Sequence, residues 1–197
     1  PAGTDVRRVA PGVLDRVLAT TSPQPVAAVV ARPDTVHPPA AAVGSGPVVV
    51  LAGIADPGNM GTIIRSAVAS GAGPVVIGPD SADPFGPKAV RASVGTVFHT
   101  MVHEVADLGG ALAGLRGSGH TVLGAAPRGG RPYDETDLTG PTALVLGGET
   151  SGLPEVVADD ARVTIPQLGP AESLNVAMAA TVLLFEAARQ RRPRKCP

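Results

Sequence analysis

Residues 48–66 read VVVLAGIADPGNMGTIIRS, which joins an apolar run to a turn and then to a segment with helical periodicity. The run at 48–54 is rich in β-branched residues and is typical of a strand buried on both faces. Met60, Ile63 and Ile64 recur at the spacing of one helix face, so residues 60–69 are predicted to form a helix that packs on this strand.

The same alternation of strand and helix continues along the chain. Further strands are predicted at 74–77, 98–103, 121–125, 142–146 and 162–165, and further helices at 87–94, 108–115 and 173–189. This order predicts an α/β fold with a mainly parallel sheet flanked by helices. The last helix has apolar or small residues at alternating spacings of four and three, which predicts a buried stripe made of Leu174, Met178, Thr181, Phe185 and Ala188.

The composition is that of one compact domain with a partial second one, because 44% of the 197 residues are hydrophobic and only 17% are charged. The apolar runs are far shorter than the roughly 20 residues that cross a bilayer. The single cysteine, Cys196, lies in the tail and excludes both an internal disulfide and a thiolate metal cluster. We therefore expect a cytoplasmic protein with no membrane span.

Proline, glycine and charge divide the chain into four parts. Residues 1–32 carry a predicted helix at 13–19 and a predicted strand at 26–30, residues 33–46 have the composition of a linker, residues 47–191 form the α/β domain and residues 192–197 a basic tail. The net charge of −1 is not typical of a protein that binds nucleic acid by bulk electrostatics. The basic cluster at 189–195 is either a solvated helix end or a local contact for nucleic acid.

Three segments place polar residues beside predicted strand ends, where open α/β sheets bind ligands. In the first, residues 56–66, the core-facing apolar positions leave Asn59, Thr62, Arg65 and Ser66 along the exposed edge of the helix. The alternative interpretation is that Gly58 and Asn59 are only turn and cap residues and that Arg65 is a surface cation.

The second segment, residues 144–154, reads LVLGGETSGLP. Gly147 and Gly148 allow a close approach of backbone to a ligand, and Glu149 follows at the end of the strand. An ordinary turn from strand to helix, with Pro154 in the first helical turn, is the alternative.

The third segment, residues 165–177, reads IPQLGPAESLNVA and delivers Ser173 and Asn175 to the start of the last helix. Ser173 has the alternative role of an N-cap, whereas Asn175 is a poor helix former inside a first turn. No G-x-G-x-x-G or Walker spacing follows a predicted strand, so we expect neither a dinucleotide site nor a phosphate cradle.

In this order and spacing, the segments resemble the three motifs of the SpoU/TrmH-type RNA ribose 2′-O-methyltransferases of the SPOUT superfamily. The resemblance covers residues 48–189 and rests on the patterns N-x-G-x-x-x-R at Asn59, Gly61 and Arg65, G-x-E-x-x-G at Gly147, Glu149 and Gly152, and S-L-N at 173–175, with an S-x-G-x-x-F element at 93–98. It implies a C-terminal trefoil knot, a rare exception to unthreaded folds. It also implies S-adenosylmethionine bound in the knot, and a homodimer that completes each site.

The resemblance also implies roles for individual residues. The cofactor would be held around Ala125, Leu146, Gly147, Gly148, Ile165, Gln167, Leu174 and Asn175, with Ala126 beside Ala125, and the catalytic set would be Asn59, Arg65, Glu149, Ser173 and Asn175. Arginine stays protonated in proteins, so we expect Arg65 to stabilise developing charge rather than to remove a proton. Glu149 has the alternative of a purely structural role. We expect no metal in the reaction.

The resemblance thus implies methyl transfer from S-adenosylmethionine to a ribose 2′-hydroxyl of RNA, with 23S ribosomal RNA favoured over transfer RNA. Residues 1–32 resemble the end of the ribosomal-protein-like RNA-recognition domain that often precedes this catalytic domain. The alternatives are a transfer-RNA 2′-O-methyltransferase and a non-catalytic RNA-binding or ribosome-assembly module on the same fold. A nucleotide-binding Rossmann enzyme is disfavoured because its glycine fingerprint is missing.

Overall fold

The computed structural model describes residues 5–18, 24–35, 46–149, 152–157 and 161–192. Contacts divide the chain into two units, Pro1–Pro33 and Asp34–Pro197. In its described part, the first unit has one short helix, α1 (Val13–Val17), which buries no residue. The strand predicted at 26–30 is wrong: these residues form no strand among the described residues, and Val29 is fully exposed, because no neighbouring strand pairs with them.

Much of the predicted linker, residues 36–45, and most of the predicted basic tail, residues 193–197, lie outside the described residues. The division into a recognition remnant, a linker, a catalytic domain and a tail therefore stays a prediction.

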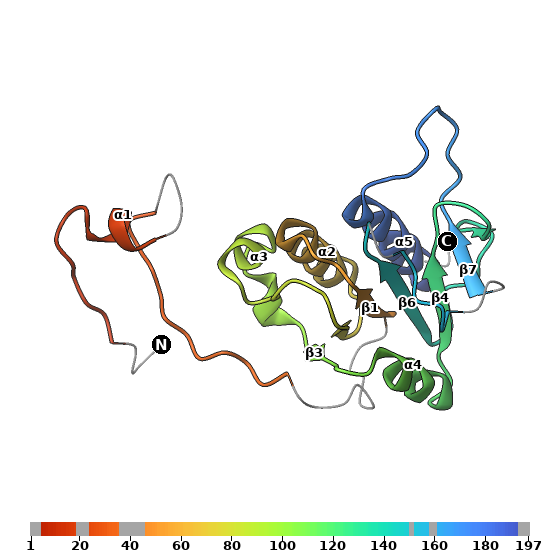
Figure 1. Cartoon of the computed structure of the whole chain (residues 1–197), viewed down its shortest axis with the longest axis horizontal. Helices are drawn as coiled ribbons and strands as arrows, with labels where there is room; N and C mark the ends of the chain where they lie inside the picture. The colour runs from red at the N-terminus through yellow and green to blue at the C-terminus, as the bar shows by residue number, and fades with distance from the viewer. Residues whose placement is uncertain (1–4, 19–23, 36–45, 150–151, 158–160, 193–197) are drawn as a thin grey trace, which may run out of the picture. The chain divides into compact units, whose positions relative to one another are not determined.

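The second unit is built on a parallel sheet (Figure 1). Its described strands are β1 (Val48–Ala52), β2 (Val75–Ile77), β3 (Val102–Glu104), β4 (Thr121–Ala125), β5 (Arg131–Pro132), β6 (Thr142–Gly147) and β7 (Arg162–Thr164). They lie in the order β3-β2-β1-β6-β4-β7-β5, and every pairing is parallel. The predicted α/β fold is confirmed, whereas the short β5 was not predicted and the knot stays a prediction.

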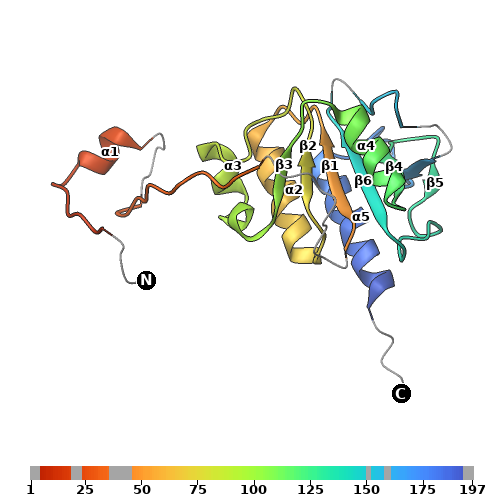
Figure 2. The same cartoon turned by 90° about the horizontal axis from the view of Figure 1, so that it is seen from below.

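Helices cover both faces of the sheet (Figure 2). They are α2 (Pro57–Ser70), α3 (Pro87–Ala92), α4 (Leu108–Gly117) and α5 (Val176–Arg191), with a 3-10 helix, η2 (Thr96–His99). Side chains of α2 and α5 share one core cluster with Leu51 of β1, while Leu112 of α4 packs with Val50 on the other face. The predicted inner face of α2 is confirmed, since Met60, Ile63 and their neighbours are buried.

The buried stripe predicted on the last helix is wrong. Met178 and Phe185 are 52% and 42% exposed, while Ala177, Ala180 and Leu184 face the core. Alanine contributes weakly to a hydrophobicity pattern, but its small side chain lets a helix lie close to its neighbours. Met178 and Phe185 therefore face outward, whereas Leu183 and Leu184 are buried.

The strand predicted at 98–103 is correct only at its end, because β3 begins at Val102. Val94 and Gly95 adopt left-handed backbone conformations, with φ of 53° and 76°, and turn the chain into η2. This turn buries Val97 against the core.

Candidate active site

The first turn of α2 is fixed by two contacts of one carboxylate. Asp56 is the N-cap, and its Oδ1 accepts a hydrogen bond of 2.8 Å from the backbone N–H of Asn59. Its Oδ2 accepts a hydrogen bond of 2.9 Å from Lys88 Nζ of α3. Lys88, and then the N–H of Asn59, hold the pKa of Asp56 below its ordinary value. Asp56 therefore remains a charged cap at neutral pH.

The side chain of Asn59 meets two other predicted site residues. Asn59 Nδ2 donates to Glu149 Oε1 at 3.3 Å. Asn175 Nδ2 lies 3.1 Å from Asn59 Oδ1 and 3.3 Å from the same Glu149 oxygen, and it donates to both. We call Asn59, Glu149 and Asn175 the polar triad. Its members come from α2, the turn after β6 and the start of α5, so the fold brings together residues far apart in the sequence.

Asn175 connects this triad to α5. Its Oδ1 accepts hydrogen bonds from the backbone N–H groups of Ala177, at 2.9 Å, and Met178, at 3.3 Å. Asn175 is thus the N-cap of α5, so the expectation that it lies inside the first turn is wrong, and so is the alternative in which Ser173 caps the helix. One end of the amide caps the helix, which leaves the other end free to donate to the triad.

The glycine turn after β6 forms one side of the site. Gly148 N donates to Ala52 O of β1, and Gly152 N donates to Gly148 O, both at 2.8 Å. A Cβ on Gly147 would collide with the carbonyl of Gly152, which itself has a φ of 65°. Only glycine at position 147 allows this close approach of the chain to itself. Residues 150–151 lie outside the described residues.

A pocket of about 460 Å³ opens beside the triad. Most of the predicted cofactor-binding residues line it, namely Ala125, Leu146, Gly147, Gly148, Ile165, Gln167 and Leu174, together with Ala126. Asn175 does not line the pocket, whereas Glu149 and Ser173 of the predicted catalytic set do. Glu149 therefore belongs to both the pocket and the triad. The volume is within the range of pockets that bind small molecules.

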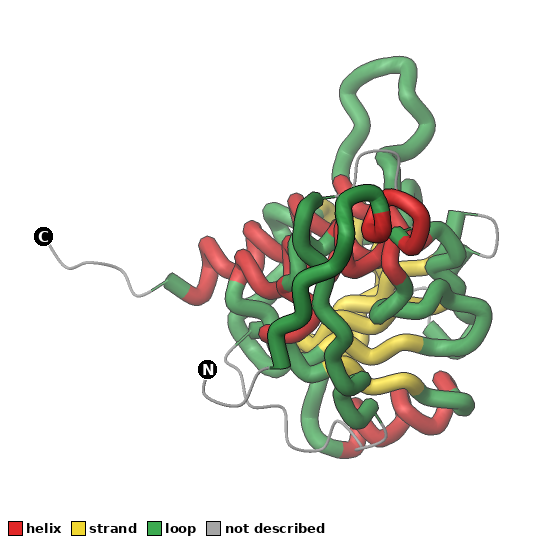
Figure 3. Tube along the Cα trace, turned by 90° about the vertical axis from the view of Figure 1, so that its left-hand side faces the viewer, coloured by secondary structure: helices red, strands yellow, loops and turns green. Residues whose placement is uncertain are grey.

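The loop between β7 and α5 stands clear of the sheet (Figures 1 and 3). Its two ends contribute Ile165, Gln167, Ser173 and Leu174 to the pocket. Gln167 Nε2 donates to Ile165 O at 2.8 Å, which folds the first part of the loop back on itself. The loop thus lines the pocket with both of its ends.

Sequence reasoning missed several residues of the pocket, namely Pro127, Arg128, Leu153, Arg162, Val163, Val176, Ala179 and Leu183. Arg128 follows β4, whose carboxyl end lies beside that of β6 in the sheet. A ligand site at adjacent strand ends is expected in open α/β sheets. The position of Arg128 just after a predicted strand could therefore have identified it as a site residue. The remaining residues carry no chemical signal in the sequence.

Arg65 lies apart from the triad and the pocket. Its side chain is exposed and, among the described residues, makes no hydrogen bond or ion pair. Arg65 is six positions beyond Asn59, so the two side chains lie roughly 120° apart around α2. Ser66, predicted to be exposed, is instead 9% exposed and shares a hydrogen bond of 2.7 Å with Thr181 of α5. This face of α2 therefore adjoins α5.

In the part of the chain that the structure describes, no group of three or more His, Cys, Asp or Glu side chains is arranged to hold a metal ion. The expectation of a metal-free reaction stays a prediction. Across the described ranges, no helix is both long and apolar enough to cross a membrane.

Comparison with known proteins shows which class this fold and pocket define. The sequence profile of the SpoU rRNA Methylase family matches residues 46–185. The rRNA methyltransferase of Sinorhizobium meliloti, solved with AdoMet bound, superposes with a TM-score of 0.71 at 35% identity, covering 78% of this chain and 60% of that chain. The chain belongs to the SpoU rRNA methylase family.

Two relatives indicate the range of proteins that share this domain. The 23S rRNA (guanosine(2553)-2′-O)-methyltransferase RlmP of Bacillus subtilis is 36% identical over 171 residues, which are 86% of this chain and 66% of RlmP. A protein of Mycolicibacterium smegmatis named as an uncharacterized tRNA/rRNA methyltransferase is 37% identical over 147 residues, which are 74% of this chain and 47% of that protein. The chain spans about half the length of such mycobacterial relatives.

Proposed function

We propose that this chain transfers a methyl group from S-adenosylmethionine to a ribose 2′-hydroxyl of RNA, with 23S ribosomal RNA as the favoured substrate. The observation that carries the proposal is the meeting of the polar triad with the glycine-walled pocket at Glu149. Relatives that act on ribosomal RNA by name, and a neighbour solved with AdoMet, support the same chemistry. We also infer a cytoplasmic location, which the single cysteine supports.

The residues of the pocket suit S-adenosylmethionine. Ala125, Ala126 and Leu146 supply an apolar wall, and Gly147 and Gly148 present bare backbone, which together favour a ligand with both apolar and hydrogen-bonding parts. Glu149 adds a carboxylate at the side of the triad, and a carboxylate favours a cationic ligand. When bound, S-adenosylmethionine supplies the electrophilic methyl group.

The residues of this chain would then bind and orient the ribose hydroxyl. A hydroxyl is a weak nucleophile, so its alignment and the stabilisation of developing negative charge dominate the rate. The triad and Ser173 are suited to positioning because Glu149 and Ser173 line the pocket, while Asn59 and Asn175 are hydrogen-bonded to Glu149. Arg65 supplies a permanent positive charge with a planar fork of donors, which matches an alkoxide beside a phosphate.

Arg65 neither lines the pocket nor contacts the triad, and we propose a homodimer in which the Arg65 of one chain serves the site of the other. The outward face of α5 carries Met178, Val182 and Phe185 at helical spacing, and their exposed fractions of 52%, 36% and 42% form an apolar stripe. Ser66, next to Arg65 in the sequence, shares a hydrogen bond with Thr181 of α5, which precedes Val182 of this stripe. Pairing two such stripes would bury them and bring each Arg65 to the partner.

A charge inside the stripe tests the dimer. Phe185→Asp should convert the protein to a monomer in light scattering, because a carboxylate is costly to bury in an apolar interface. Met101→Asp is the matched control, since Met101 is 41% exposed but lies next to β3 rather than on α5. An unchanged mass for Phe185→Asp, with the control also unchanged, would reject this interface.

The reaction itself is tested with S-adenosylmethionine that carries a labelled methyl group. Label should enter ribosomal RNA that lacks the modification, and mapping of 2′-O-methyl sites should locate it on one ribose. Transfer-RNA labelling alone would move the substrate assignment to transfer RNA. Binding of S-adenosylmethionine with no label in either RNA would favour the non-catalytic module, and calorimetric binding of nicotinamide dinucleotide alone would reject the methyltransferase.

A further inference from the structure

Asp56 and Lys88 form a connection that none of the roles assigned above uses. Asp56 Oδ1 accepts from the N–H of Asn59, and Asp56 Oδ2 accepts from Lys88 Nζ, so one carboxylate joins the start of α2 to α3. A Cβ on Gly58 would lie 2.7 Å from Asp56 Oδ1 and 3.7 Å from Lys88 Cε. The pair therefore lies close to position 58, where a larger side chain would require the Asp56 carboxylate to shift.

Asp56 and Lys88 fix the first turn of α2, and this turn carries Asn59. The side chain of Asn59 donates to Glu149 and accepts from Asn175, and its direction depends on the backbone of the first turn of α2. The side chains of Lys88 and Asp56 are 61% and 49% exposed, and exposed ion pairs contribute little to folding stability. A strong effect of this pair on catalysis would therefore arise from geometry.

We propose that Asp56 and Lys88 are positioning residues for the methyl transfer, acting through Asn59 on the polar triad. This inference rests on the proposed function for its kinetic consequence, whereas its structural consequence is independent of activity. The charged form of Asp56 is the one that binds both Lys88 and the Asn59 N–H, in agreement with its lowered pKa.

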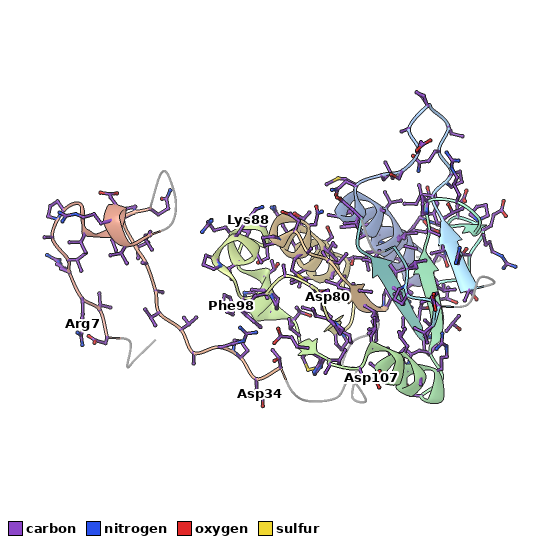
Figure 4. All side chains as sticks on the ribbon, in the orientation of Figure 1. Arg7, Asp34, Asp80, Lys88, Phe98 and Asp107 are labelled. Atoms are coloured by element: carbon purple, nitrogen blue, oxygen red, sulfur yellow. The ribbon has the colours of Figure 1, made fainter. Side chains whose placement is uncertain are left out.

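A matched control separates positioning from ordinary capping. Asp107 is the N-cap of α4, and its side chain accepts from the N–H of Gly110 at 3.0 Å, on the helix that covers the other face of the sheet. Figure 4 labels Lys88 on α3 and Asp107 at the start of α4, in different parts of the domain. Asp56→Ala and Asp107→Ala each remove one such cap, and each should lower the melting temperature by about 2–4 °C.

Only Asp56→Ala should also lower turnover, by roughly 10-fold or more, because small misplacements of site groups slow the chemical step. Its affinity for S-adenosylmethionine should stay within about twofold, since Asp56 does not line the pocket. Asp56→Ser, which keeps a cap without charge, should recover part of the turnover. Lys88→Met should add nothing to the loss in Asp56→Ala, because both residues act through one contact.

A second readout follows the contact itself. The side-chain amide resonances of Asn59, assigned by their loss in Asn59→Ala, should shift in Asp56→Ala and Lys88→Met of the full chain but not in Asp107→Ala. If the resonances and turnover of Asp56→Ala match those of Asp107→Ala, the inference is overturned. If the resonances shift while the unmodified protein labels no RNA, positioning of Asn59 stands and the proposed function falls.

Discussion

Two positions of α2, Asn59 and Arg65, differ in the contacts that their side chains make within one chain. Asn59, in the first turn, donates to Glu149 and accepts from Asn175, and its backbone is held by Asp56. Arg65, less than two turns further on, is exposed and contacts neither the polar triad nor the pocket. One helix thus carries Asn59, whose side chain is hydrogen-bonded to other site residues, and Arg65, whose side chain is not. Under the proposed dimer, one chain supplies the positioning groups, while the charge for the reaction comes from a second chain.

The largest effect on turnover is expected for substitution of Arg65. Arg65→Ala should lower turnover by roughly 100-fold or more, because it removes charge stabilisation that acts only in the transition state. Cofactor affinity should hardly change, since Arg65 does not line the pocket. Single-turnover methylation with labelled S-adenosylmethionine and calorimetry measure the two quantities separately.

Arg65→Lys keeps the charge and serves as the control for its geometry. It should restore little turnover, because an ammonium group cannot reproduce the planar fork of a guanidinium. Full turnover of Arg65→Ala on its RNA would remove Arg65 from the mechanism, and a large loss of cofactor affinity would place it in the pocket instead.

Mixing two impaired variants tests whether the Arg65 and the Asn175 of one site come from different chains. When Arg65→Ala and Asn175→Asp subunits are mixed and allowed to exchange, half of the dimers should be mixed, and each of these should hold one intact site. Activity should then rise to about a quarter of the unmodified level, well above the average of the separate variants. No gain after exchange, verified by tagged subunits, would show that both residues serve one site from one chain.

A smaller effect on turnover is expected for substitution of Asn175 in the polar triad. Asn175→Asp keeps the Oδ1 that caps α5, so the melting temperature should be nearly unchanged. It loses the Nδ2 donor and brings a second carboxylate to Glu149, so turnover should fall by about 10-fold. Asn175→Ala, by contrast, should also lose about 1 kcal/mol of stability with the cap. A drop in stability for Asn175→Asp comparable to that of Asn175→Ala would contradict this separation of roles.

The fold was largely predictable because its signals are local. The apolar run at β1 and the periodicity of Met60, Ile63 and Ile64 specify a buried strand and a helix, and both are confirmed. The outward face of α5 was not predictable, because Met178 and Phe185 have the same hydrophobicity whether they meet a core or another chain. The strand prediction at 26–30 was wrong for a related reason, because a strand needs a neighbouring strand that the local pattern does not reveal.

The site was predictable where a motif marks a residue and not where only the fold places it. The residues of the triad follow from the three motifs, but their mutual distances depend on the alignment of β1, β6 and the start of α5. The capping role of Asn175 was missed because the start of α5 was placed too early. Arg128 and Arg162 reach the pocket from separate strand ends and belong to no motif.

The smallest effect concerns the pH at which Asp56 is protonated and the first turn of α2 loses its hydrogen bonds to this carboxylate. Lys88 and the N–H of Asn59 bind the charged form of Asp56, so the pKa of Asp56 in the folded protein lies below its ordinary value of 3.8. A lowered pKa means that the contribution of Asp56 is fully present above its unfolded pKa and is lost as the pH falls through the folded pKa. Lys88→Met should raise the pKa of Asp56, because the largest of these contacts is gone. Carbon chemical shifts of the Asp56 carboxyl group, followed from pH 7 into acid, measure this change. An unaltered titration in Lys88→Met would mean that the N–H of Asn59 alone stabilises the charged carboxylate of Asp56. The first turn of α2 would then be fixed without a contribution from α3.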